Sequence, residues 1–317
     1  MKRHGLLIPV LAAAGALFFC PVAQAWGCKG HQTVALLAEK HLTPAAKQMF
    51  VALLQNNPID PKLARFCGAE AADDFADAAT WADDVRALRP ETAPWHFLDI
   101  PLGAPHGPLA AFCGAAGCVT QAIELQLAIL KDKTAASAKR AEALRFLIHF
   151  VGDLHQPLHT TTNGDRGGNC VPVKYFRRTP HQHDTSYEPN LHHLWDVEIL
   201  ERNAAGADPA EIADFLEVSF ASEFPNWQQA GKHLEDWAWE GHEHAEETAY
   251  GALAKKIAVE PDVPVHTCAD NREIGARMLH KHIVAGQTYQ DEAASVVEER
   301  LAQAGIRLAL LLNEAAK

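Results

Sequence analysis

The sequence predicts an all-α protein, a single mostly helical domain with at most one short β-ribbon. Hydrophobic residues make up 48% of its 317 residues and charged residues 21%, a composition typical of globular proteins. In most long segments the apolar residues recur at helical spacing. The alternation typical of strands is rare, and residues 171–176 are the best candidate for the ribbon. Residues 160–189, rich in Thr, Gly, Pro and His, are predicted to form a loop.

The N-terminus has the pattern of a secretory leader. Lys2 and Arg3 precede an apolar stretch, and residues 23–25 read Ala-Gln-Ala, a small-x-small cleavage site. We therefore expect residues 1–25 to be a signal peptide and residues 26–317 to form the mature domain, which begins at Trp26. The apolar stretch is short for a membrane span, and no later segment is long and apolar enough to be one. The expected protein is soluble, and either secreted or periplasmic.

The helices expected in the mature chain follow one another with few interruptions. Their ranges are 31–41, 44–55, 119–132, 136–156, 190–202, 208–221, 225–257 and 271–316. Thr43 followed by Pro44 is a helix start signal, because Thr caps and Pro fits the first turn. The aromatic residues of the C-terminal part are predicted to lie in the core: Trp227, Trp237, Trp239 and Tyr250.

Cysteine usage agrees with export. Of seven cysteines, Cys20 lies in the leader and six remain, and an even number in an exported chain favours disulfides. Cys113 and Cys118 flank a short Gly/Ala loop and are predicted to pair. The other four allow three pairings, among which the sequence does not choose: Cys28, Cys67, Cys170 and Cys268.

Charge and histidine content narrow the function. The formal net charge is −12, which argues against a protein that holds duplex DNA on a broad basic face. A nucleic-acid enzyme whose positive charge comes from bound metal remains compatible with this charge. The 18 histidines raise the question of a metal site, because histidine is the commonest metal ligand.

Two helical segments carry a His-x-x-x-Asp pair. His149 and Asp153 are one helical turn apart, so they share a face, and imidazole and carboxylate both bind zinc. The second pair is His192 and Asp196, and Trp195 beside it indicates burial, where an unpaired His or Asp would be costly. One such pair alone is usually a surface ion pair. Two pairs in buried-looking helices, with His159 just beyond the first, predict a metal site.

A family resemblance joins these pairs to other segments. Five elements occur in one order, Trp26-Gly-Cys-Lys-Gly-His31, Trp81-Ala-Asp83, Trp95-His96-Phe97-Leu98-Asp99, the run His149 to His159, and Asn190-Leu-His192-His-Leu-Trp-Asp196. Together they resemble the single-strand-specific zinc nucleases, the S-one/P-one nucleases, which are related to zinc-dependent phospholipase C. The resemblance spans Trp26 to Asp196, with a helical tail after it.

The resemblance implies three zinc ions and their ligands. One zinc would be held by Asp83, His96, His149 and Asp153, and a second by His159, His192 and Asp196. The third would be held by His31, Asp153 and Trp26. Trp26 would bind through its free α-amine and its carbonyl oxygen, a role that requires removal of the leader.

The resemblance also implies the activity and the remaining site residues. The protein would be an endonuclease and 3′-nucleotidase that hydrolyses single-stranded DNA and RNA to 5′-phosphate products. Asp83, Arg86 and Asp153 would be catalytic, with Arg86 offsetting charge on the phosphoryl oxygens. The residues implied to contact the substrate are Phe97, Asp99 and Asn169. We expect a monomer without membrane attachment or an obligate protein partner.

Two alternatives remain open at this point. A zinc-dependent phospholipase C would have the same fold and metal cluster, but its second helical pair usually ends in Glu, so Asp196 favours the nuclease. A non-catalytic exported zinc-binding protein would need neither Arg86 nor the Phe97 and Asp99 pair, and would more often close its coordination shells.

Overall fold

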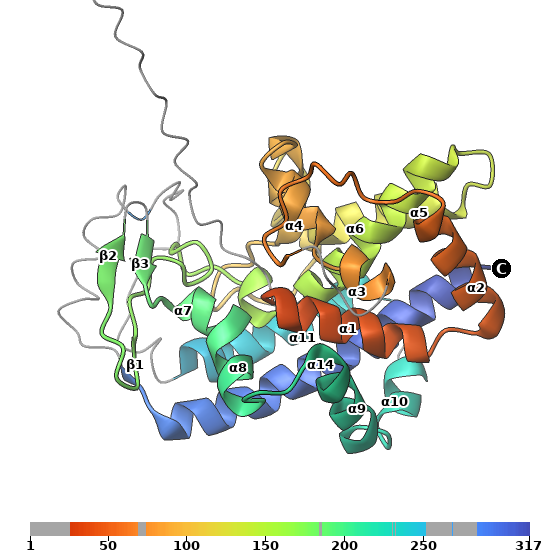
Figure 1. Ribbon diagram of the computed structural model, residues 1–317. Coiled ribbons are helices and arrows are strands. Elements are labelled where there is room, and N and C mark those ends of the chain that lie inside the picture. The colour runs from red at the N-terminus through yellow and green to blue at the C-terminus, as the bar shows by residue number, and fades with distance from the viewer. Residues whose placement is uncertain are drawn as a thin grey trace, which may run out of the picture.

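The computed structural model describes residues 26–68, 74–183, 186–229, 231, 233–251, 268 and 284–317. Over these ranges the chain is mostly helical, which confirms the predicted fold class (Figure 1). The expected signal peptide, residues 1–25, lies outside the described residues, as do residues 252–257 and 271–283 of two expected helices. None of the described helices combines the length and the apolar character needed to cross a membrane.

The first half of the chain contains six helices and three short turns of 3₁₀ helix among its described residues. These are α1 (Cys28–Lys40), α2 (Pro44–Gln55), α3 (Asp74–Ala78), α4 (Trp81–Arg86), η1 (Pro90–His96), η2 (Leu109–Ala111), α5 (Val119–Lys131), α6 (Ser137–His155) and η3 (Pro157–His159). The predicted start of α2 is confirmed, because the Thr43 side chain accepts a hydrogen bond from the N–H of Ala46 at 3.3 Å. Pro157 follows α6 directly, so the chain turns there and brings His159 back toward the helix.

The helices in the second half of the chain are shorter and more often interrupted than the sequence predicts. Its helical elements are α7 (Leu191–His193), the π-helical η4 (Leu194–Glu198), α8 (Ile199–Asn203), α9 (Pro209–Ser219), α10 (Phe224–Gln229), α11 (Leu234–His244), the π-helical η5 (Ala245–Tyr250) and α14 (Gln287–Ala315). The prediction of one helix over 225–257 is wrong. Gly231 has φ 85°, a left-handed conformation that a right-handed helix does not contain, and it lies between α10 and α11.

Two small strand pairs complete the described fold. β1 (Lys174–Tyr175) pairs in parallel with β4 (Val284–Ala285), and β2 (His181–His183) pairs antiparallel with β3 (Ser186–Glu188). The predicted ribbon over 171–176 therefore reduces to β1, whose partner lies far along the chain. The predicted loop 160–189 is wrong at its end, where β2 and β3 form a hairpin. Residues 284–285, expected to be helical, form β4 because they pair with β1.

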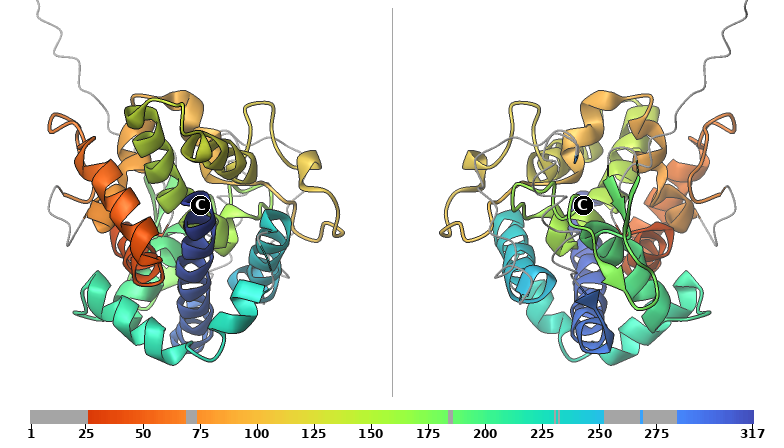
Figure 2. Two further views of the ribbon diagram at one scale, coloured as in Figure 1. Left: turned by 90° about the vertical axis from the view of Figure 1, so that its right-hand side faces the viewer. Right: turned by 90° about the vertical axis from the view of Figure 1, so that its left-hand side faces the viewer.

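The long helix α14 forms the centre of the fold. Figure 2 shows it end-on, with the other helices arranged around it, and it packs against α1 and α6. A Cβ atom at Gly305 of α14 would lie 2.8 Å from Leu37 of α1, so these helices approach too closely for any larger residue. The four aromatic residues predicted to lie in the core, Trp227, Trp237, Trp239 and Tyr250, are all buried.

Three disulfides join the six remaining cysteines. Cys113 pairs with Cys118, as predicted. Among the pairings left open by the sequence, the structure has Cys28 with Cys67 and Cys170 with Cys268. The first of these ties the N-terminal turn of α1, one helical turn before His31, to the loop that precedes α3.

Candidate metal centre and active site

Seven helical elements carry the eight predicted zinc ligands other than Trp26 and bring them together. His31 comes from α1, Asp83 from α4, His96 from η1, His149 and Asp153 from α6, His159 from η3, His192 from α7 and Asp196 from η4. Each of these side chains is buried; the most exposed, Asp83, has 7% of its surface accessible. So many buried ionisable groups in one place would be costly without a partner that satisfies them.

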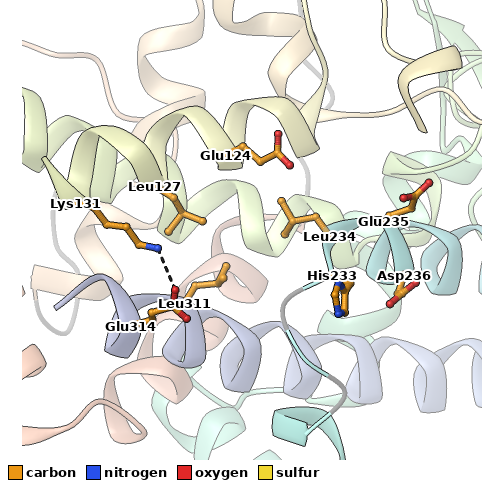
Figure 3. Close-up of a pocket in the computed structure, with 9 residues that line it drawn as sticks. All are labelled: Glu124, Leu127, Lys131, His233, Leu234, Glu235, Asp236, Leu311 and Glu314. Carbon is orange, nitrogen blue, oxygen red and sulfur yellow. Dashed lines mark hydrogen bonds and ion pairs between the residues drawn. The ribbon is translucent and has the colours of Figure 1, made fainter. Parts of the chain in front are cut away.

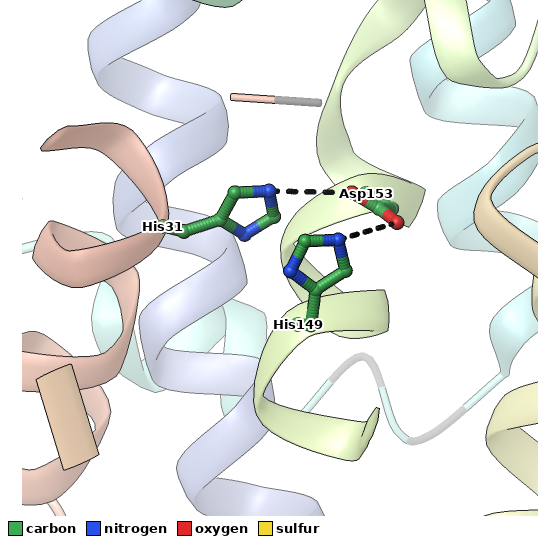
Figure 4. A group of neighbouring side chains, drawn as sticks. All are labelled: His31, His149 and Asp153. Carbon is green, nitrogen blue, oxygen red and sulfur yellow. Dashed lines mark ion pairs between the residues drawn. The ribbon is translucent and has the colours of Figure 1, made fainter. Parts of the chain in front are cut away.

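The predicted ligands form two groups, and the first consists of His31, Asp83, His96, His149 and Asp153. Asp153 lies at the centre of this first group. Its Oδ1 atom is 3.4 Å from Nε2 of His31, and its Oδ2 atom is 3.3 Å from Nε2 of His149 (Figure 4). The same Oδ2 atom is 3.1 Å from Nδ1 of His96. The two carboxylate oxygens therefore face different histidines, an arrangement in which one carboxylate can bridge two metal ions.

Asp83 contacts two histidines of the same group, His96 and His149. Its carboxylate oxygens lie 3.7 Å from Nδ1 of His96 and 3.9 Å from Nε2 of His149. Arg86, one turn later on α4, has its Nη1 atom 3.6 Å from Oδ1 of Asp83. The first group thus has the guanidinium of Arg86 beside it, next to Asp83.

The second group is smaller and consists of His159, His192 and Asp196. Nε2 of His192 lies 3.3 Å from Oδ2 of Asp196 and 3.2 Å from Nε2 of His159. Nε2 of His159 lies 4.0 Å from Oδ1 of Asp196. In the part of the chain that the structure describes, three sets of ligand atoms each lie within 4.8 Å of one another: His31, His149 and Asp153; Asp83, His96 and His149; and His159, His192 and Asp196.

Backbone carbonyls orient three of these imidazoles. Nδ1 of His149 donates to the carbonyl of Ala79, Nδ1 of His159 to that of His96, and Nδ1 of His192 to that of Gly167, each at 2.7 Å. With the proton on Nδ1, each Nε2 atom presents its lone pair to the cluster. This is the usual way in which a protein prepares histidine for a metal.

The residues fit divalent metal ions. Oδ1 of Asp153 and Oδ2 of Asp196 are buried and make no hydrogen bond, although a buried carboxylate oxygen normally has one. Burial raises the pKa of Asp153 to about 6 and raises that of Asp196 well above its ordinary value. Metal cations would meet both oxygens and restore their charge, and the nitrogen and oxygen donor set is one that zinc prefers.

Trp26 lies against both groups. Its indole Nε1 donates to the carbonyl of Gly152, the residue before Asp153, at 2.8 Å. The N–H of Gly27 donates to the carbonyl of Asp196 at 2.7 Å. Trp26 itself is fully buried, so the first described residue of the chain is held beside the predicted ligands.

The predicted substrate-contacting residues lie on the segments next to the cluster. Phe97 is half-buried directly after His96, and Asp99 is exposed. The surrounding protein, which desolvates Asp99, and the charge of Asp165 raise the pKa of Asp99 to about 6, against the opposing effect of Arg166. The glycine-containing loop 163–168 is thus near Asp99. The Asn169 side chain donates to the carbonyl of Arg166 at 2.8 Å, so its amide holds the loop's own backbone.

A hollow lies elsewhere on the molecule, away from the cluster. It measures about 520 Å³ between α5, α11 and α14, and its walls include Glu124, Glu235, Asp236 and Glu314 (Figure 3). The cation Lys131 in its wall is paired with Glu314 at 3.2 Å. An acidic hollow would repel a phosphodiester, so this surface does not suit a polyanionic substrate.

The fold and the cluster define a mostly helical metal-dependent hydrolase. A comparison with protein-family models matches residues 26–317 to the S1/P1 nuclease family. The chain belongs to this family, whose members in general depend on zinc, and it is a nuclease, a hydrolase of phosphodiester bonds.

The similarity to several nucleases extends over nearly the whole chain. Nuclease S1 of Aspergillus oryzae is 26% identical, over 97% of this chain and 96% of its own length. Endonuclease 2 of Arabidopsis thaliana is 26% identical over 98% of both chains. Nuclease P1 of Penicillium citrinum is 26% identical over 91% of this chain and 97% of its own. The family match decides for the nuclease against phospholipase C and the non-catalytic binder.

Sequence reasoning missed two supporting residues. Gln156 donates to Oδ1 of Asp196 at 2.5 Å. Asp165 accepts hydrogen bonds from Tyr250 at 2.9 Å and from the N–H of Gly168 at 2.9 Å, which shapes the loop that holds His192. The sequence His155-Gln156-Pro157 could have indicated the role of Gln156, since a polar residue between the end of a helix and a proline often caps the next helical turn. The second depends on a contact across 85 positions, which no local pattern reveals.

Proposed function

We propose that the mature chain, residues 26–317, is an exported trizinc enzyme that cuts single-stranded DNA and RNA and removes phosphate from 3′-nucleotides, leaving 5′-phosphate products. The observation that carries the proposal is the meeting of both His-x-x-x-Asp pairs in one buried cluster, in which Oδ1 of Asp153 and Oδ2 of Asp196 make no hydrogen bond. Zinc held there would supply a Lewis acid and lower the pKa of a bound water toward ~7.

The proposed ligands divide among three ions. Asp83, His96, His149 and Asp153 would hold the first, His159, His192 and Asp196 the second, and Trp26, His31 and Asp153 the third. His149 also lies within reach of the His31 group. Three divalent cations outweigh the three aspartates, so the cluster would be positive within a protein of formal net charge −12. A phosphodiester would then be attracted to this site rather than to the general surface.

The protein's own residues would position the substrate. Arg86 would donate to the phosphoryl oxygens as negative charge develops on them. Phe97 would stack on a base, and Asp99 would accept hydrogen bonds from the base edge. A duplex hides the faces of its bases, so a stacking site of this kind favours single strands. Asn169 would contribute by holding the neighbouring loop.

We further propose that export prepares the site. Removal of residues 1–25 would give Trp26 a free α-amine, which binds zinc, whereas the amide nitrogen of an unprocessed chain is a poor ligand. Protein that begins at Trp26 should therefore contain more zinc than protein with an added Met before Trp26. Equal zinc content and equal activity would remove Trp26 from the ligand set. The compartment would be the periplasm or the medium, and the enzyme would act as a monomer.

The test of the function compares neighbouring histidines. His192 is a proposed ligand, whereas His193 is half-buried and lies 3.6 Å from Glu198. We expect His192→Ala to lose zinc and activity on single-stranded oligonucleotides, and His193→Ala to keep both. Wild-type protein should cut single strands faster than a duplex of the same sequence, and a chelator should abolish cutting. A chelated enzyme of full activity would contradict the proposal.

Substrate choice is tested by Phe97→Ala. Loss of base stacking, about 1–3 kcal/mol, should lower kcat/KM for oligonucleotides roughly 5- to 150-fold, because about 1.4 kcal/mol is tenfold. Bis(p-nitrophenyl) phosphate lacks a base and should be affected far less. Asp99→Asn should mainly change the preference among bases, since an amide offers one donor and one acceptor. Normal cutting by both variants would disprove the base site.

A further inference from the structure

Gln156 occupies the junction between the two metal groups. It is fully buried and follows α6 directly, with extended backbone angles of φ −81° and ψ 117°. It is both the residue that ends α6 and the N-cap of η3. Apart from its hydrogen bond to Asp196, Gln156 has none of the roles described above.

The backbone of Gln156 joins two proposed ligands. Its N–H donates to the carbonyl of Asp153 at 3.0 Å, and its carbonyl accepts the N–H of His159 at 2.9 Å. These two bonds fix the step from the end of α6 to the turn that carries His159. Gln156 therefore contributes directly to the position of His159 relative to Asp153.

The side chain of Gln156 joins a third ligand. Its Nε2 atom donates to Oδ1 of Asp196 at 2.5 Å, and its Oε1 atom accepts the N–H of Leu158 within η3. The amide holds one oxygen of Asp196 and leaves Oδ2, which makes no hydrogen bond, facing Nε2 of His192 at 3.3 Å. Every polar group of Gln156 is thus directed to a proposed ligand or to the turn that carries one.

We infer that Gln156 is a positioning residue, which orients Asp196 and His159 for the second metal ion and sets that ion's place relative to Asp153. This inference rests on the proposed zinc cluster. A neutral amide suits the role, because it fixes the carboxylate without cancelling the negative charge that attracts the metal. Asp83 differs in this respect, since it faces the cation Arg86 at 3.6 Å. Outer contacts of this kind typically change metal affinity 10- to 100-fold.

The experiment compares two buried glutamines. Gln290 on α14 is 2% exposed, accepts from the hydroxyl of Tyr175 and donates to the carbonyl of Ile199 at 3.1 Å, and it contacts none of the proposed ligands through these bonds. Gln156→Met and Gln290→Met each remove an amide of the same size and burial. Zinc dissociation constants are measured on folded mature protein by competition with a chromophoric chelator, together with melting temperatures.

We expect both Met variants to melt at lower temperature, but only Gln156→Met to bind one of its zinc ions about 10- to 100-fold more weakly. In the background Asp196→Asn, which itself loses that ion, Gln156→Met should cause no further loss of zinc. If Gln156→Met does not fold, Gln156→Leu carries the same expectation, since it is also uncharged and removes the donor to Asp196.

Failure of the positioning role and failure of the proposed function are distinguishable. Wild-type dissociation constants for every zinc ion in Gln156→Met, or in Gln156→Leu, would overturn the positioning role while leaving the proposed function intact. Equal weakening by Gln290→Met would overturn it as well, since the effect would then be general destabilisation. A wild-type protein that binds no zinc would instead overturn the proposed function.

Discussion

The two His-x-x-x-Asp pairs have the same contact in different surroundings. In each pair the histidine Nε2 lies 3.3 Å from Oδ2 of the aspartate, and the histidine Nδ1 donates to a backbone carbonyl at 2.7 Å. The first pair stands on α6, a regular helix of 19 residues. The second spans the junction of α7 with the π-helical η4. The motif therefore determines the contact between the histidine and the aspartate, and the surrounding residues determine the charge around each pair.

The surroundings differ mainly in charge. Burial alone would lower the pKa of His149, but the carboxylates of Asp153 and Asp83 raise it to about 9. Burial lowers the pKa of His192 to about 4, because no comparable pair of carboxylates offsets it. The histidines of the two motifs thus hold protons very differently, and a metal must displace a proton from His149 but not from His192 at neutral pH.

The largest expected effect separates the two aspartates. Asp153→Asn should lose the ions that depend on His31, His96 and His149, whereas Asp196→Asn should lose one ion. We expect activity to fall by ~10³-fold or more for Asp153→Asn, because several kcal/mol of charge stabilisation is lost and ~1.4 kcal/mol is tenfold.

Zinc per chain and cleavage rate measure this difference. Asp84→Asn is the control, because Asp84 is buried beside Asp83 but pairs with Arg65. Equal zinc loss from Asp153→Asn and Asp196→Asn would contradict the sharing of Asp153.

A smaller effect is expected at Arg86, the cation that lies beside Asp83 of the first group. Arg86→Met should lower kcat about 10²- to 10³-fold, the usual cost of removing one donor to a developing oxyanion, and should leave the zinc content unchanged. Arg89→Met is the matched control, since Arg89 lies one turn later and pairs with Glu91 at 3.3 Å. If steady-state kinetics give the same kcat for both variants, Arg86 has no catalytic role.

Two glycines allow each group to be disturbed separately. A Cβ at Gly152 would lie 2.9 Å from Nδ1 of His31, and a Cβ at Gly167 would lie 2.6 Å from the carbonyl oxygen of Leu158. Gly152→Ala should weaken zinc at the first group about 10- to 100-fold with little change in melting temperature, because Ala favours the helix by about 1 kcal/mol.

Gly167→Ala should affect the second group and also lower the melting temperature. Gly167 has φ 59°, where a side chain costs roughly 1–2 kcal/mol, and its carbonyl orients His192. Zinc titration and thermal melting of both variants separate the two outcomes. Weakening of the same zinc ion by both substitutions would show that the groups are not independent.

The smallest effect concerns pH. The raised pKa of His149, about 9 against an ordinary 6.5, stabilises the metal-free protein below pH 6.5, and this stabilisation is lost as the pH rises through 9. The lowered pKa of His192, about 4, acts in the opposite direction: the unfolded state binds more protons, so stability is lost as the pH falls from 6.5 toward 4.

The same pKa shifts determine how zinc affinity depends on pH, because a histidine must lose its proton before it can bind zinc. Below pH 9, zinc affinity at the His149 group should fall about tenfold for each pH unit, because each unit is ~1.4 kcal/mol of competition with the proton. At the second group, protonation of His192 should not compete with zinc until the pH falls to about 4. The proton that competes there is the one on Asp196, whose pKa is raised by burial. Zinc titration of Asp196→Asn and Asp153→Asn over this range isolates each group. A flat response of the His149 group would contradict the difference.

Much of the fold was predictable because it depends on local patterns. The apolar spacing of α1, α2, α5 and α6 and the cap at Thr43 act within a few residues. Gly231 interrupts a helical pattern that continues on both sides, so periodicity alone joined α10 to α11. β1 was expected without its partner, because β4 lies more than a hundred residues away, and the pairing of Cys28 with Cys67 is likewise a tertiary contact.

The metal cluster was more predictable than its support. Helical spacing brings His149 to Asp153 and His192 to Asp196 without knowledge of the fold, and the family resemblance placed His31, Asp83 and His96 with them. Gln156, Asp165 and Tyr250 act through contacts between distant segments. Such contacts form only when the chain folds, and the spacing of residues in the sequence does not show which distant segments they join.

Anomalous diffraction at the zinc absorption edge, from crystals of protein whose N-terminus is confirmed as Trp26, tests the metal cluster most directly. We predict three peaks: one among Asp83, His96, His149 and Asp153, one among His159, His192 and Asp196, and one between His31, Asp153 and Trp26. Well-ordered crystals grown with zinc that have no anomalous peak among these residues would contradict the proposed centre.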